Sequence, residues 1–147
     1  MTAAYLEFEL PEPARFERLV KVFDRLKRSK EQDSWPEIHS WLELFDDAAK
    51  ATFWWPTADE LAAWQRRWFS TPVESRFSDP SLETPWGFDS MIGAFEDGDY
   101  DLVECRKVGD KLGRLEFDPH GWPFGGTGCM RALIEAFGGR VVAEWGT

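Results

Sequence analysis

Residues 118–139, DPHGWPFGGTGCMRALIEAFGG, lead from a glycine-rich loop into the most clearly patterned helix of the chain. Apolar side chains recur there at helical spacing, as Met130, Leu133, Ile134 and Phe137, and Gly138-Gly139 is typical of a helix C-terminus. We expect these four side chains to anchor the helix to a sheet. The glycines before the helix then supply the tight turning that a strand-to-helix connection needs.

Strands are predicted on both sides of this helix. RVVAEW at 140–145 follows it, and YDLVECRKV at 100–108 and KLGRLEF at 111–117 precede it as a hairpin. Gly109-Asp110 between those two runs matches a two-residue turn with glycine first. At the other end of the chain, YLEFEL at 5–10 alternates apolar and polar residues, which indicates a half-buried strand.

Three more helices follow from apolar periodicity and capping signals. The first spans about 14–26. The second spans about 58–69, where Thr57 and Glu60 form a capping box. The third begins at Asp89 or Ser90 and ends at Gly98, which we expect to take a positive φ. Their apolar faces are Phe16, Leu19, Val20, Phe23 and Leu26; Leu61, Trp64 and Trp68; and Phe88, Met91, Ile92 and Phe95.

Residues 34–50, together with the strand-like run that follows them to residue 55, fit two structures. Ile38, Trp41, Leu42 and Phe45 fit a helix with Ser34 and Glu37 as its capping box, whereas LELF and ATFWW on either side of DDAAK fit a hairpin. We favour the hairpin. The next segment without periodicity, 71–87, contains three prolines and is interpreted as a long connection.

These elements predict an α+β fold in the order βαββα, loop, αββαβ. The expected architecture is a largely antiparallel sheet of about six strands, with helices mainly on one face. Two interlocked ferredoxin-like halves, 1–70 and 88–147 joined by 71–87, would give this arrangement within a single domain spanning 1–147. The exposed face of such a sheet would offer a binding surface.

Composition excludes several classes of function. Lysine and arginine total 17 against 27 acidic residues, so a net charge of −10 argues against nucleic-acid binding. We expect no membrane span and a cytoplasmic location, because no long apolar run or secretory signal pattern is present. Hydrophobic residues make up 43% of the chain and include nine tryptophans, which indicates a folded globule.

Cysteine, histidine and acidic spacing give no sign of a cofactor or metal. Cys105 and Cys129 are too few for a disulfide framework, and Cys105 lies among apolar neighbours typical of a core. EDGDYD at 96–101 begins like a calcium loop, but Leu102 stands where the loop requires glycine. His39 is interpreted as structural.

The loop at 118–129 holds the candidate ligand-binding residues. GGTG lacks the lysine of a phosphate-binding loop, so a plain turn with Thr127 as helix cap is the first interpretation. The alternative is a pocket for a small molecule, or an enzyme site in which Cys129 is activated by the helix dipole and His120. The residues concerned are His120, Trp122, Thr127 and Cys129.

Acidic side chains gather where the third helix ends, without a basic residue among them. They are Glu96, Asp97, Asp99 and Asp101, and a face of this kind suits a basic protein partner. The leading hypothesis is therefore a non-enzymatic, acidic interaction domain that binds a basic protein partner, as inhibitors or immunity proteins do.

Tryptophans support a third hypothesis, a homodimer that buries surplus aromatic surface. Trp41, Trp64 and Trp68 are predicted to lie in the core. Trp54 and Trp55 are adjacent in a predicted strand, so one of them must be exposed or covered by the other half.

Overall fold

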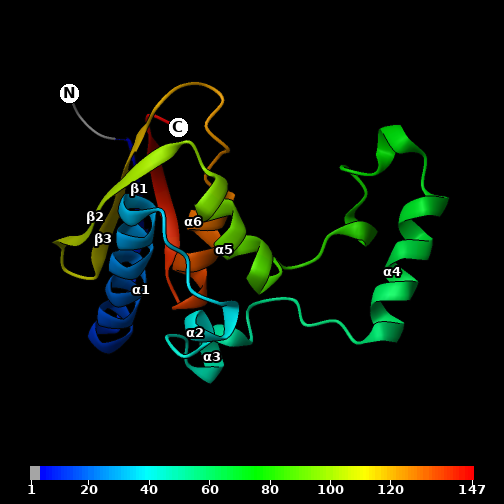
Figure 1. Cartoon of the computed structure of the whole chain (residues 1–147), viewed down its shortest axis with the longest axis horizontal. Coiled ribbons are helices and arrows are strands. Elements are labelled where there is room, and N and C mark those ends of the chain that lie inside the picture. The colour runs from blue at the N-terminus through cyan, green and yellow to red at the C-terminus, as the bar shows by residue number, and fades with distance from the viewer. Residues whose placement is uncertain (1–3) are drawn as a thin grey trace.

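The computed structural model describes residues 4–147, and Met1 to Ala3 lie outside the described residues. One antiparallel sheet with strand order β2-β3-β1-β4 is present (Figure 1). Strand β1 is central and pairs with β3 on one side and β4 on the other. The strands are β1 (Ala4–Glu9), β2 (Tyr100–Gly109), β3 (Leu112–Pro119) and β4 (Arg140–Trp145).

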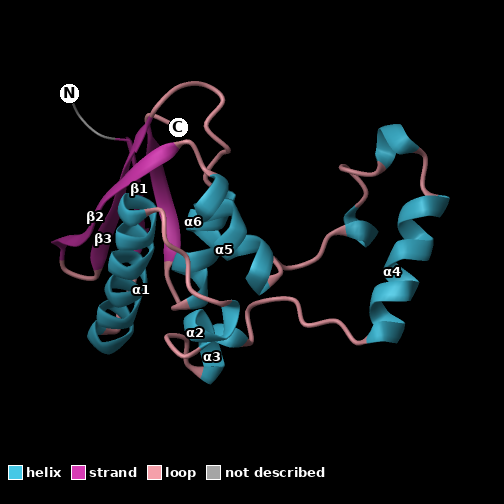
Figure 2. Ribbon diagram, viewed as in Figure 1, coloured by secondary structure: helices cyan, strands magenta, loops and turns pink. Residues whose placement is uncertain are grey.

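Helices cover one face of this sheet, as the colouring by secondary structure shows (Figure 2). The long helix α1 (Pro13–Gln32) lies against β2, and α5 (Phe88–Asp97) and α6 (Gly128–Ala136) pack against each other, with α6 also contacting β4. The other face of the sheet carries ion pairs between neighbouring strands, such as Glu7 with Arg114. We call the sheet and these helices the body. No helix within residues 4–147 combines the length and apolar character needed to cross a bilayer.

The helix predicted from residues 118–139 is confirmed. Met130, Leu133, Ile134 and Phe137 are all fully buried in the core. Gly138 ends the helix with a φ of 88°, a conformation that glycine adopts without the strain a Cβ would add. The strands predicted at 5–10, 100–108, 111–117 and 140–145 and the helix near 14–26 are also present, and α1 is longer than expected.

Two glycines differ from their predicted roles. Gly109 belongs to β2 and pairs with Leu112, so the hairpin turns at Asp110 and Lys111, and Lys111 takes a φ of 60°. Gly98 follows α5 with a φ of −63°, so the expected positive φ is wrong. The N-cap of α5 is also different from the prediction: Gly87 occupies it, whereas Asp89 and Ser90 lie within the helix.

The hairpin favoured for residues 34–55 is wrong, because two short helices, α2 (Ile38–Leu42) and α3 (Asp47–Lys50), form there. Asp46 caps α3 by accepting a hydrogen bond from the Ala49 N–H at 2.8 Å. Helical turns also bring Phe45 and Phe53 together against Phe88 in one aromatic cluster. The capping box of the helical alternative is also absent, since Glu37 occupies the N-cap of α2 without a side-chain hydrogen bond.

Loss of that hairpin reduces the sheet from the expected six strands to four in the part of the chain that the structure describes. The two ferredoxin-like halves are therefore not formed: the first half contributes only β1, and the remaining strands come from the second. The coarser expectation, an α+β fold with one antiparallel sheet, is confirmed.

The helix predicted at 58–69 is confirmed as α4 (Ala58–Ser70), with its capping box between Thr57 and Glu60. It stands apart from the body (Figure 1). We call residues 57–82 the arm; besides α4 they include two 3-10 turns, Val73–Ser75 and Pro80–Leu82. Residues 53–56 and 83–87 form the stem, where the Trp54 N–H donates to the Trp86 carbonyl at 2.9 Å.

Two tryptophans predicted to lie in the core are found on the arm. Trp41 is buried as predicted, but Trp64 and Trp68 are only partly buried and stack on each other with ring centroids 5.3 Å apart, so their assignment to the core is wrong. Of the adjacent pair in the stem, Trp55 is half exposed.

Candidate functional site

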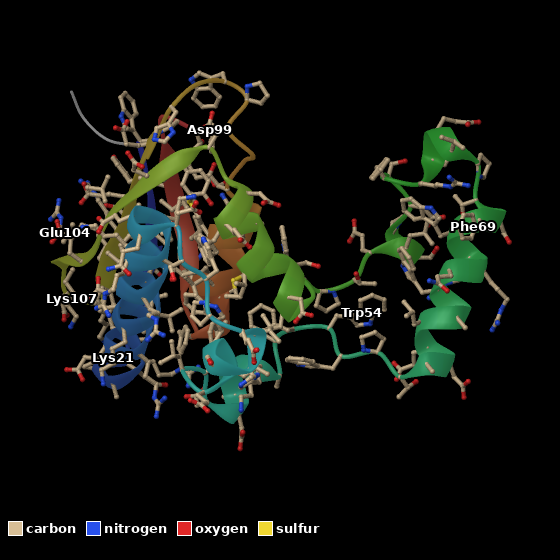
Figure 3. The ribbon with its side chains drawn as sticks, in the orientation of Figure 1. Lys21, Trp54, Phe69, Asp99, Glu104 and Lys107 are labelled. Atoms are coloured by element: carbon tan, nitrogen blue, oxygen red, sulfur yellow. The ribbon has the colours of Figure 1, made fainter. Side chains whose placement is uncertain are left out.

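One end of the body brings together the C-terminus of α5, the start of β2 and the loop at 119–127. Backbone hydrogen bonds hold these segments: the Asp99 N–H donates to the Phe124 carbonyl at 2.9 Å, and the His120 N–H donates to the Asp99 carbonyl at 3.0 Å. Asp99 lies at this end of the body (Figure 3). We call the surface the acidic end, and its residues are Glu96, Asp97, Asp99, Asp101, His120 and Trp122.

His120 lies between two carboxylates of this surface. Its Nδ1 is 2.9 Å from Asp99 Oδ1 and its Nε2 is 3.1 Å from Asp101 Oδ2. Hydrogen bonds to Asp101 and Asp99 raise the pKa of the His120 imidazole above its usual value. The protonated ring donates to both carboxylates and so ties the loop to β2.

Lys30 supports the same surface from α1. Its ammonium donates to the Phe95 carbonyl at 2.7 Å and to the Gly98 carbonyl at 2.8 Å, and it lies 4.5 Å from the ring centroid of Tyr100. Burial lowers the pKa of Lys30, although Asp101 and other carboxylates oppose that effect. A cation at the C-terminus of α5 offsets the helix dipole that would otherwise repel the acidic residues following it.

Trp122 is the large apolar side chain displayed here. It is 67% exposed, and its ring packs at 4.7 Å against Phe124, measured between centroids. Phe124 is buried and contacts both Phe117 and Tyr100. The loop is thus anchored in the core through Phe124 while it presents Trp122 to solvent. Gly125 and Gly126 take φ values of 104° and 80°, which lets the loop turn back toward α6.

A hollow of about 330 Å³ lies beside the loop, lined by Trp122, Phe124, Thr127 and Glu144 among others. The Thr127 hydroxyl donates to Glu144 Oε1 at 3.2 Å, and the Arg131 Nε–H donates to the same oxygen at 2.8 Å. Burial opposes ionisation of Glu144, but these hydrogen bonds outweigh it and lower the pKa of that carboxyl. Thr127 occupies the N-cap of α6, and its carbonyl accepts the Arg131 N–H at 3.0 Å, but its side chain makes no capping hydrogen bond to the helix.

Cys129 lies beneath this surface, in the core. It is 3% exposed, and its Sγ is 3.4 Å from the Tyr100 hydroxyl. Burial raises the pKa of Cys129, although the hydrogen bond with Tyr100 opposes that effect. Cys105 is buried as expected, and burial raises its pKa to about 12. Both thiols are free.

The structure therefore brings together some of the predicted ligand-binding residues and the predicted acidic partner-binding residues. His120 and Trp122 lie with the acidic residues, Thr127 lies at the hollow, and Cys129 lies in the core. Sequence reasoning missed Lys30, Phe124 and Glu144. The position of Phe124, a large apolar residue between Pro123 and Gly125, could have indicated that it anchors the loop. No local sequence pattern indicates the hydrogen bond between Lys30 and Gly98.

The acidic end carries charged groups on exposed side chains. Its titratable groups are exposed carboxylates and one imidazole, and within residues 4–147 no cluster of His, Cys, Asp or Glu is arranged to hold a metal ion. Carboxylates with an adjacent exposed indole can form ion pairs and an apolar contact with the same ligand. No protein-family model, curated protein or solved structure matches the chain.

Proposed function

We infer that this protein binds a basic protein partner through its acidic end. The observation that supports this most directly is that exposed carboxylates and the loop that displays Trp122 meet at one end of the body, where Asp99 is hydrogen-bonded to the loop. Such a surface combines the charge that steers a partner with an aromatic anchor of the kind that dominates interface energies.

The carboxylates retain capacity for a partner after their internal contacts are made. Asp99 and Asp101 each use one oxygen on His120, and a carboxylate accepts several hydrogen bonds. Glu96 and Asp97 are exposed beside them at the end of α5. Lysine and arginine side chains of a partner can therefore pair with this surface without displacing the loop.

Rigidity also favours binding here. Phe124 is buried, Lys30 fixes the end of α5, and His120 ties the loop to β2. A surface already held in place loses less conformational entropy when a partner binds.

Neutralising the carboxylates tests the proposal. The triple variant Asp97→Asn, Asp99→Asn, Asp101→Asn is compared with Glu17→Gln, Glu43→Gln, Asp110→Asn, which removes the same charge from exposed sites elsewhere. The probe is a set of peptides of equal length that differ only in their number of arginines and lysines, with affinity measured at low and moderate salt.

We expect the wild type and the control variant to bind the basic peptides, with affinity that falls as salt rises, and the first triple variant to lose at least tenfold in affinity. Equal losses in both triple variants would mean that net charge alone governs binding. That result would contradict a site at the acidic end.

Trp122→Ala separates the aromatic contact from the charges. Removing an exposed indole that anchors a partner costs about 2 kcal/mol or more in binding. We expect this loss to persist at high salt, unlike that of the carboxylate variant. Unchanged affinity in Trp122→Ala would remove the indole from the proposed interface.

The hollow beside Trp122 supports a second candidate function, binding of a small apolar molecule. Its volume of about 330 Å³ lies at the lower end of the range for ligand pockets. A screen of fragments observed through the indole N–H signal of Trp122 would detect it. Absence of any shift at millimolar fragment concentrations would rule this candidate out.

A further inference from the structure

The arm displays apolar side chains that its own chain leaves uncovered. Phe69 is 75% exposed and Phe77 is 89% exposed, and Val73 and Leu61 are exposed with them. Figure 3 shows Phe69 on the arm, well separated from Trp54 at the stem. Several large apolar side chains exposed on one short segment are typical of an interaction site.

The arm also has little internal stabilisation. Every residue of the 13-residue helix α4 is at least partly exposed. Its internal contacts include Trp64 and Trp68 stacked on each other, the edge of Phe77 against Trp68, and the Trp64 Nε1–H donating to the Leu82 carbonyl at 2.9 Å. Arg76 adds to them, because its Nε–H donates to the Trp68 carbonyl at 3.0 Å and its guanidinium lies over the Trp68 ring. Isolated helices of this length are marginal in water, so packing against a further surface is needed to keep the arm ordered.

Two hollows flank the place where the stem joins the body, which we call the root. The larger, about 360 Å³, is lined by Trp54, Trp55, Pro56 and Phe88, with Asp89 at its edge. The smaller, about 140 Å³, is lined by Phe53, Pro85, Trp86 and Ala132 among others. Trp55 and Trp86 are half exposed there, so the root is a second uncovered apolar surface.

The stem holds Phe69 of the arm away from its own root (Figure 3). Its two segments are joined by the hydrogen bond from Trp54 to Trp86, and Trp54 packs on Trp64 at the base of the arm with ring centroids 5.9 Å apart. Pro56 and Pro85 hold the residues before them in extended conformations. Short, stiff connections of this type favour exchange of an element between two copies over closure within one.

The exposed aromatic area and the charges on the arm and the root are both consistent with an interface between two copies of this chain. Taking 150–250 Å² for each aromatic side chain, the exposed parts of Phe69, Phe77, Trp55 and Trp86 come to roughly 500 Å² per chain. A reciprocal contact buries twice that in aromatic surface alone, a large part of the roughly 1,200–2,000 Å² in a standard interface. Arg66, three residues before Phe69 on the same helix face, is exposed, as is Asp89 at the root.

We propose that two copies of this chain exchange arms, with α4 of one copy docking its Phe69 face on the root of the other and Arg66 pairing with Asp89 across the interface. The two-fold relation makes both contacts at once. Because the arm and the root lie outside the acidic end, this proposal and the binding of a basic partner succeed or fail separately.

The first test measures mass by light scattering across a concentration series. We expect a dimer for the wild type and a monomer for Phe69→Ser, Phe77→Ser. The matched control is Val103→Ser, Val142→Ser, which removes two exposed apolar side chains from strands of the body and should remain dimeric. Far-ultraviolet circular dichroism and the thermal midpoint confirm that each variant is folded.

The second test reverses the proposed ion pair. Asp89→Arg and Arg66→Asp should each be monomeric alone, because like charges then face one another in both halves of the interface. An equimolar mixture should form heterodimers, since one half then retains the native pair and the other has it reversed. Recovery in the mixture requires contact between chains, so a loss of folding cannot imitate it.

Three results would overturn the proposal. A wild type that stays monomeric throughout the series would remove it, as would a dimer that persists in Phe69→Ser, Phe77→Ser. A mixture of the two charge variants that stays monomeric would exclude Arg66 and Asp89 as interface partners and with them the proposed geometry.

Discussion

The ring of Tyr100 occupies the space in which a side chain on Gly98 would stand. A Cβ added at residue 98 would overlap the Tyr100 ring and hydroxyl. Gly98 follows α5 and Tyr100 begins β2, so the end of the helix and the start of the sheet are packed closely at this point. The tight approach explains Gly98 without any need for a positive φ.

Gly98→Ala should therefore destabilise the protein. Tyr100 is fully buried, so its ring can move only by disturbing Phe117 and Phe124, and overpacking of this kind costs about 1–3 kcal/mol. Urea unfolding measures the change. Gly93→Ala is the control: it lies within α5, its added Cβ meets no atom within 4 Å, and it should stabilise the helix by about 0.5–1 kcal/mol. Equal effects of the two substitutions would contradict this account.

Lys30→Met should also destabilise the protein. It removes two charge-assisted hydrogen bonds to the Phe95 and Gly98 carbonyls and leaves the end of α5 uncapped, at a cost of about 1–3 kcal/mol. Lys21→Met, on an exposed part of the same helix, should change the free energy of unfolding by less than about 0.5 kcal/mol. A loss confined to Lys21→Met, or no loss in either variant, would show that the cap at α5 contributes nothing.

The raised pKa of His120 predicts a pH dependence of stability with a definite sign. The folded state binds the imidazole proton more tightly than the unfolded state does. The resulting stabilisation is fully present below the ordinary pKa of about 6.5 and is lost as pH rises through the raised pKa of the folded state.

Nuclear magnetic resonance titration of the His120 ring checks this, with His39→Gln used to assign the signals. We expect the double variant Asp99→Asn, Asp101→Asn to bring the pKa of His120 down and to remove the corresponding loss of stability as pH rises above about 6.5. An unchanged midpoint in the double variant would show that the two carboxylates are not the cause of the shift.

Much of the body was predictable because the sequence patterns of its helices and strands are local, and the side chains that they mark as apolar faces are the ones that are buried. The apolar faces of α1, α5 and α6 and the alternation in β1 each specify one structure and one buried side. Residues 34–55 were not predictable in this way. Their apolar residues suit short helices and strands equally, and the choice is made by long-range packing of Phe45 and Phe53 against Phe88.

The candidate site and the arm also depend on long-range contacts that local sequence patterns do not reveal. The side chains of Asp99, Asp101 and His120 are of types that often form functional sites. Their contact, however, joins residues about 20 positions apart and depends on the β2–β3 pairing. For α4, the sequence correctly predicts an amphipathic helix, and such a helix is expected to bury its apolar face. Where that face points is decided by the stem, through the contact of Trp54 with Trp86, and no helical periodicity encodes that direction.

The two thiols should react slowly in the native protein. Burial raises the pKa of both Cys129 and Cys105, and the Tyr100 ring lies against Cys129, so little thiolate is accessible near neutral pH. A disulfide reagent added to native protein should react at the rate of structural opening, whereas both thiols should react at once in urea. Tyr100→Phe keeps the ring but removes the hydroxyl that favours the Cys129 thiolate, so it should not accelerate the reaction. Rapid native modification of Cys129, with a midpoint below about pH 8.5, would instead indicate an activated nucleophile and restore the enzyme hypothesis over the binding one.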